Sequence, residues 1–200
     1  MTFLTEFADQ AVILPLAMAV ALLLAAGFWW RGAIAWIACV GGTLGTIGVG
    51  KLVLAACGPL HFGDVLQSPS GHTASATIVY GGLLGLAWRH IRPAQNMAPI
   101  SAALAIAVVI GITRVVLNTH SWPEVVVGGW VGCVGVWLLL ALAGQPPSTL
   151  RPARLAVVVM VIVALMHGTH LRAEANIQEL GRRFAWLVPG CDASAAQVRP

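Results

Sequence analysis

The segment Pro69-Ser70-Gly71-His72 brings together groups that could hold an anion beside a proton donor. Pro69 cannot extend a preceding helix, and Ser70 is a favourable N-cap for the helix expected to follow. Gly71 lets the backbone approach a ligand closely, and free N–H groups at a helix start attract anions. Histidine can transfer a proton near neutral pH. We interpret the segment as a phosphate site with a built-in acid; the alternative is a capped turn with an incidental histidine.

A second histidine, His120, precedes Glu124 by four residues, with Pro123 between them. A carboxylate that accepts a hydrogen bond from one imidazole nitrogen fixes the tautomer and makes the other nitrogen a better nucleophile. The pair therefore predicts a nucleophilic histidine directed at phosphorus. The alternative is that Glu124 only stabilises a helix start through the helix dipole, which leaves His120 without a role.

Two cationic side chains, Lys51 and Arg114, lie inside apolar segments, where ionisable groups are costly and usually functional. The alternative for each is that it snorkels to the lipid headgroups. Phosphoryl transfer needs cationic groups and N–H donors around the equatorial oxygens, with the attacking and leaving groups in line. Lys51 and Arg114 would supply the charge and the Gly71 amide a donor. His120 and His72 would form the in-line pair.

The composition determines which kind of protein must position these groups. Of 200 residues, 58% are hydrophobic and only 9% are charged, whereas about a quarter of the residues of a soluble domain are charged. This excludes an ordinary soluble enzyme and predicts a polytopic helical membrane protein. We expect one all-α domain, with a lipid bilayer and no nucleic acid as partners. The oligomeric state stays open.

The apolar runs predict six transmembrane helices, at residues 11–30, 33–57, 72–88, 98–117, 123–143 and 155–166, followed by a polar tail at 167–200. Residues 1–10 carry Glu6 and Asp9 but no basic residue, so they do not form a secretory signal. The second span contains small residues that would let helices approach closely, within one chain or between chains. They are Gly41, Gly42, Gly45, Gly48 and Gly50.

Basic residues in alternate loops set the expected orientation: Arg31, Arg89, Arg92, Arg151 and Arg154. The positive-inside rule places these loops in the cytoplasm. Both termini and the loops at 58–71 and 118–122 are then outside. The alternation of the spans brings five ionisable groups to this outer face: Lys51, His72, Arg114, His120 and Glu124. We expect a bacterial cytoplasmic (inner) membrane protein with its active site on the periplasmic side.

In combination, these motifs resemble the phosphatidic acid phosphatase type 2 family, the membrane lipid phosphatases related to vanadium haloperoxidases. That family carries K-x6-R-P, P-S-G-H and S-R-x5-H-x3-D. The corresponding segments here are Lys51-x6-Gly58-Pro59, Pro69-Ser70-Gly71-His72 and Thr113-Arg114-x5-His120-x3-Glu124. Their order and spacing match, and the motif-bearing core covers about residues 33–143.

The resemblance implies a six-helix, haloperoxidase-like bundle and catalysis through a phosphohistidine, with no metal or other cofactor. By position, His120 is the nucleophile, His72 protonates the leaving group, and Glu124 orients His120. The phosphate-binding residues would be Lys51, Ser70, Gly71 and Arg114. The implied substrate is a lipid phosphate, such as phosphatidate, phosphatidylglycerol phosphate, a polyprenyl pyrophosphate or a lipid A phosphate.

The sequence departs from the family pattern at two positions. Glu124 replaces an aspartate, which keeps the charge but adds a methylene group. Gly58 replaces an arginine and removes a bidentate phosphate contact. Other basic residues could fill this gap: His61, Arg172, Arg182 or Arg183. The alternatives to hydrolysis are a phosphotransferase on the same scaffold and a non-catalytic lipid-phosphate binder or transporter.

The four cysteines fall into two pairs by position. Cys39 and Cys133 lie inside apolar spans, where we expect them to act as small packing residues. Cys57 and Cys191 both fall near the expected outer face, where they could form a disulfide in an oxidising compartment.

Overall fold

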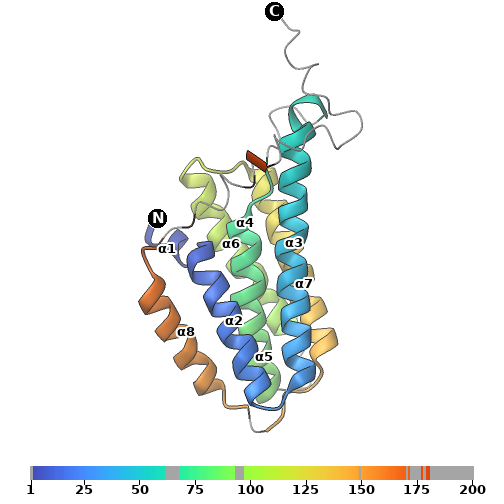
Figure 1. Cartoon of the computed structure of the whole chain (residues 1–200), viewed down its shortest axis with the longest axis vertical. Helices are drawn as coiled ribbons and strands as arrows, with labels where there is room; N and C mark the ends of the chain where they lie inside the picture. The colour runs from blue at the N-terminus through green and yellow to red at the C-terminus, as the bar shows by residue number, and fades with distance from the viewer. Residues whose placement is uncertain are drawn as a thin grey trace, which may run out of the picture.

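The computed structural model describes residues 2–61, 68–92, 97–148, 150–169, 171, 177 and 179–180. Within these ranges all regular structure is helical, as predicted, and the long helices lie side by side in one bundle (Figure 1). The helices are α1 (Thr2–Glu6), α2 (Gln10–Ala26), α3 (Trp30–His61), α4 (Gly71–Ala76), the π-helical turn η1 (Thr77–Gly81), α5 (Gly82–Ile91), α6 (Met97–Val116), α7 (Trp122–Ala143) and α8 (Pro152–Met166).

Among the described residues, helices at three of the six predicted spans are long and apolar enough to cross a membrane: Trp30–Ala55, Ala98–Val116 and Trp122–Ala143. Two further helices, α2 and α8, are apolar but shorter, with 17 and 15 residues. The remaining predicted span corresponds to α4, η1 and α5, which follow one another without a break in the helical path. The count of six spans therefore stays a prediction.

The boundaries of the first two predicted spans were wrong by up to four residues. α2 ends at Ala26 because Gly27 caps it and Phe28 turns the chain with φ 58°. The next helix already begins at Trp30 and continues to His61. Residues 58–61, which were predicted to lie in the outer loop, therefore belong to α3, and Gly58 is among them.

Glycines of α7 let the helices around it approach closely. A Cβ atom on Gly132 would lie 2.6 Å from Cβ of Thr77 in η1, and one on Gly135 would overlap Oγ1 of Thr43 in α3. The sequence had predicted such packing at the glycines of α3. A Cβ atom on Gly41, Gly42, Gly45 or Gly48 would meet no atom within 4 Å. A Cβ atom on Gly50 would lie 3.4 Å from Cγ of Pro69. Close packing within the chain is therefore found only for Gly50 of this set, and contacts between copies stay a prediction for the other four.

Two arginines hold the end of the bundle at which α7 terminates. Arg31 Nε donates to the carbonyl of Leu142 at 2.8 Å, and Arg89 Nη1 donates to the carbonyl of Leu140. Cations are favourable there because the last carbonyls of a helix carry partial negative charge. The loops joining α2 to α3 and α7 to α8 lie at this lower end in Figure 1, whereas α2 and α4 begin toward the upper end.

Candidate active site

The predicted turn at Ser70 begins α4 as expected. Ser70 has an extended backbone, and its Oγ accepts from the backbone N–H of Thr73 at 3.4 Å and lies 2.9 Å from Thr73 Oγ1. Both residues are fully buried. Gly71 follows with Lys51 of α3 directly over it, since a Cβ atom on Gly71 would lie 3.4 Å from Lys51 Cε. The absence of a side chain at residue 71 thus brings a lysine to the first turn of α4.

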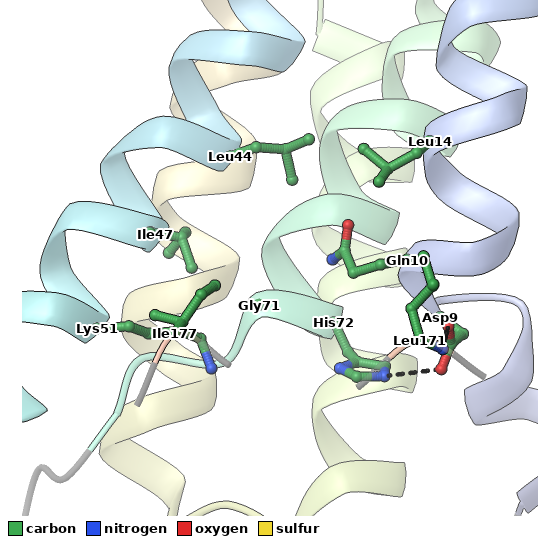
Figure 2. A pocket seen from close by; sticks show the side chains of 11 residues that line it. Asp9, Gln10, Leu14, Leu44, Ile47, Lys51, Gly71, His72, Leu171 and Ile177 are labelled. Atoms are coloured by element: carbon green, nitrogen blue, oxygen red, sulfur yellow. Dashed lines mark hydrogen bonds and ion pairs between the residues drawn. The ribbon is translucent and has the colours of Figure 1, made fainter. Parts of the chain in front are cut away.

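A cavity of about 210 Å³ opens beside this turn. Its polar wall contains Lys51, His72, Asp9 and Gln10, together with Gly71. In Figure 2 Lys51, His72 and Asp9 lie below Leu14 and Leu44, with Gln10 between the two levels and with Ile177 beside Lys51 and Leu171 beside Asp9. Its apolar wall is formed by Leu14, Leu44, Ile47, Gly48, Leu171 and Ile177. The lining therefore offers a lysine and a histidine to an anionic group and aliphatic side chains to hydrocarbon.

His120 and Glu124 form the predicted pair at the start of α7. His120 Nδ1 lies 2.9 Å from Glu124 Oε2, and both residues are buried. With Nδ1 donating to the carboxylate, Nε2 keeps its lone pair, which is the state a nucleophile needs. The predicted geometry of this pair is thus present.

Glu124 also caps the start of α7. The alternative that it stabilises the helix start is therefore correct, but it does not describe the contact with His120. It is the N3 residue of a capping box with Ser121, whose backbone N–H donates to Oε2 at 3.0 Å. The backbone N–H of Ser68 donates to Oε1 at 2.8 Å. Capping boxes use glutamate or glutamine at N3 because the side chain must reach back to the N-cap. This requirement accounts for glutamate where the family pattern has aspartate.

Two hydrogen bonds to Glu124 join the two histidine motifs. Besides the bond from Ser68, the backbone N–H of Ser70 donates to the carbonyl of Glu124 at 3.0 Å. The turn that carries His72 is therefore fixed to the first turn of α7. The cavity lined by Lys51 and His72 therefore lies at the same end of the bundle as the contact between His120 and Glu124.

Lys51 and Arg114 are both inside the protein rather than directed outward. Their side chains are buried, with 5% and 8% of the residue exposed, which is contrary to snorkelling. Lys51 lines the cavity, and Arg114 occupies the last turn of α6, six residues before His120. α6 packs against both α4 and α7. The predicted assignment of these cations to phosphate stays a prediction.

One contact of His72 was not predicted from the sequence. Asp9, which precedes α2, has its Oδ2 atom 3.9 Å from His72 Nε2, and both side chains are largely buried (Figure 2). The only signal in the sequence was that Asp9 stands just before an apolar run, which is typical of an N-cap. That signal predicts that Asp9 caps α2, but it does not predict the contact with His72, which is 63 positions later in the sequence.

Several predicted contributors lie outside the described residues: Arg172, Arg182, Arg183 and Cys191. The side chains of His61 and Cys57 do as well, so the disulfide stays a prediction. Gly58 lies seven residues after Lys51 on the same helix, about 10 Å further along its axis. Cys39 packs in the buried core and Cys133 packs against it, as predicted.

The comparison with protein families bears on the segment that contains this site. The family model of the PAP2 superfamily matches residues 50–146, which include Lys51, α4 to α7 and both histidines. This segment resembles the phosphatidic acid phosphatase type 2 family. The resemblance inferred from the three motifs is therefore confirmed. Searches of curated proteins and of solved structures gave no significant match.

The PAP2 resemblance supports a phosphatase-type activity on phosphate esters. The geometry agrees with that chemistry, because a buried histidine–carboxylate pair lies next to a turn with a lysine and a second histidine. The three long apolar helices are compatible with an integral membrane protein.

Proposed function

We propose that this protein hydrolyses a phosphate or pyrophosphate group from a membrane lipid, through a phosphohistidine at His120. The observation that carries the proposal is the cavity, whose lining combines Lys51, Gly71 and His72 with aliphatic side chains such as Leu14 and Leu44. A soluble phosphate ester would have no use for the apolar wall, whereas a lipid phosphate matches both parts.

The first chemical step forms the phosphoenzyme. His120 Nε2 attacks phosphorus with its lone pair while Nδ1 donates to Glu124. The bond from phosphorus to the leaving oxygen breaks, and that oxygen takes a proton from protonated His72. The products are phosphohistidine and the lipid alcohol, or the lipid monophosphate when the substrate is a pyrophosphate.

The second step returns the enzyme to its starting state. Water attacks the phosphorus of the phosphohistidine and gives a proton to His72, which is neutral after the first step. The phosphorus–nitrogen bond breaks and inorganic phosphate leaves. In both steps Lys51, Arg114 and the N–H groups of the α4 turn would stabilise charge on the equatorial oxygens.

We also propose that the chain crosses the membrane six times, with the site at the outer face of the bacterial inner membrane. Arg31 and Arg89 support this orientation, since both lie at the end of α7 opposite to His120. The 17 residues of α2 span about 26 Å and the 15 of α8 about 22 Å, against a hydrocarbon core of about 30 Å. These two helices would cross with polar flanks drawn into the headgroup region.

The experiment is phosphate release by purified protein in detergent micelles. The substrates are phosphatidate, phosphatidylglycerol phosphate, a polyprenyl pyrophosphate and a lipid A phosphate, each with and without excess EDTA. We expect release from at least one lipid, unaffected by EDTA, and a loss of at least about a thousandfold in His120→Ala. No release from any lipid by folded protein, or equal release by His120→Ala, would contradict the proposal. A phosphorylated product on an added lipid or sugar alcohol would instead identify a phosphotransferase.

A further inference from the structure

Asp9 presents its two carboxylate oxygens to different partners. Oδ1 accepts the backbone N–H of Ala11 at 2.8 Å, which caps α2, and the backbone N–H of Leu171 at 3.2 Å. Oδ2 lies 3.9 Å from His72 Nε2. Capping a helix uses only one oxygen. The second oxygen is therefore held in place by the first and is directed at the histidine.

His72 has a matching orientation in the cavity. Figure 2 shows its imidazole with one ring nitrogen toward Asp9 and the other on the side where Lys51 enters the cavity. Asp9 itself is 8% exposed, so its charge is only weakly screened by water. A carboxylate in this position favours the protonated imidazole and fixes the orientation of the ring.

We propose that Asp9 is a positioning residue that keeps His72 protonated and directed at the leaving group. This inference rests on the proposed phosphatase function, and it gives that function a second histidine–carboxylate pair. Glu124 orients the nucleophile His120, and Asp9 orients the acid His72. The second carboxylate comes from residue 9, outside the segment 50–146 that resembles the PAP2 superfamily.

Within the part of the chain that the structure describes, the other charged groups near His72 do not match Asp9 in this role. α4 packs against α2, α3, α6, α7 and η1. Among the described side chains, the ionisable groups of these elements toward the same end of the bundle are Lys51, Arg114, Tyr80 and Glu124, with Asp9 just before α2 and His120 just before α7. Lys51 and Arg114 would disfavour a protonated imidazole because they carry the same charge. Glu124 is directed to His120 and two backbone N–H groups, and Tyr80 donates to the carbonyl of Phe7.

The test compares wild type with Asp9→Asn on substrates that differ in leaving group. Asparagine keeps an oxygen that can accept from Ala11 and Leu171, so α2 stays capped while the charge is lost. One substrate is a lipid phosphate with an alkyl leaving group, and the other is p-nitrophenyl phosphate, which needs little help from an acid. We expect kcat to fall about 10- to 100-fold on the lipid and less than threefold on the aryl ester. The alkaline limb of the pH–rate profile should move to lower pH.

Matched variants separate positioning from folding. Asp9→Ser also keeps a cap without a charge and should reproduce the result, whereas Asp9→Glu should recover part of the lipid activity. Glu6→Gln is the control, because Glu6 lies in the same segment but pairs with His167 at 3.1 Å and does not line the cavity. It should match wild type.

The outcomes distinguish this inference from the function on which it rests. If wild type is active and Asp9→Asn and Asp9→Ser keep its pH profile and its ratio of rates on the two substrates, Asp9 has no such role. An equal loss on both substrates, with no movement of the alkaline limb, would assign Asp9 to structure alone. A wild-type protein that releases phosphate from neither substrate would overturn the proposed function itself.

Discussion

Gly128 of α7 packs directly against the main chain of Ser70, so closely that a Cβ atom at residue 128 would overlap the Ser70 carbonyl oxygen. The contact lies one turn after Glu124, whose own carbonyl accepts from the N–H of Ser70. The turn that carries His72 therefore packs against two successive turns of α7. Backbone against backbone leaves no flexible side chain to move aside.

We expect Gly128→Ala to displace this turn. The added methyl group should lower the free energy of unfolding by about 1–3 kcal/mol, as overpacking of a buried site does, and should lower kcat because His72 moves with the turn. The measurements are thermal unfolding in detergent and phosphate release. Gly111→Ala is the control, since its new Cβ atom would have its nearest neighbour, in Val125, at 3.4 Å, an ordinary contact. Unchanged activity in Gly128→Ala would show that the turn can shift without cost to the site.

Glu124→Gln should separate catalysis from helix capping. Glutamine is accepted at N3 of a capping box, so we expect a loss of only about 1 kcal/mol in unfolding free energy. The negative charge that holds the His120 tautomer is gone, however, and kcat should fall about 10²- to 10⁴-fold. Ser121→Ala is the converse variant, which removes the cap side chain and keeps the carboxylate. Comparable activity in the two variants would argue against an orienting role for Glu124.

Gly48→Leu should obstruct the apolar part of the cavity. Gly48 lines the cavity, and a Cβ atom there would meet nothing within 4 Å, so a leucine side chain has room to enter it. We expect KM for long-chain lipid phosphates to rise about tenfold while a short-chain analogue is little affected. Gly45→Leu is matched to it, being equally open but not part of the lining. Equal effects of the two variants, or equal effects on long and short chains, would place the hydrocarbon elsewhere.

Gly58→Arg tests the departure from the first family motif. If the site has only lost a phosphate ligand, the new guanidinium should raise turnover several-fold. Gly58→Leu adds comparable bulk without charge and should not raise it. Lower turnover in Gly58→Arg, with normal turnover in Gly58→Leu, would mean that another cation already serves this position.

The convergence of the site at one end of the bundle was predictable from the sequence. Helices that alternate in direction must bring together the end of α3, the start of α4, the end of α6 and the start of α7. The placement of Lys51 and His120 at the same end of the bundle follows from this alternation. Local patterns also sufficed for the Ser70 cap and for the His120–Glu124 pair, because both involve residues within four positions of each other.

Contacts between distant segments were beyond the same reasoning. The approach of Asp9 to His72 depends on how α2 tilts against α4, which no local pattern records. Four of the five glycines chosen in α3 have no close neighbour in the chain for a related reason, since a run of small residues in α3 and a looser series in α7 look alike until the neighbours are known. The π-helical turn at Thr77–Gly81 likewise has no distinctive residue pattern.

Glu124 both contacts His120 and caps α7, and this combination restricts which substitutions the protein can accept at residue 124 during evolution. A chain that drifts away from catalysis would normally be free to substitute its catalytic carboxylate, yet here any residue without a long hydrogen-bonding side chain would also loosen the first turn of α7. Descendants that no longer turn over substrate should therefore keep glutamate, or accept glutamine, at residue 124. Retention of that residue in an inactive copy would be a trace of its architecture and no sign of surviving enzymatic activity.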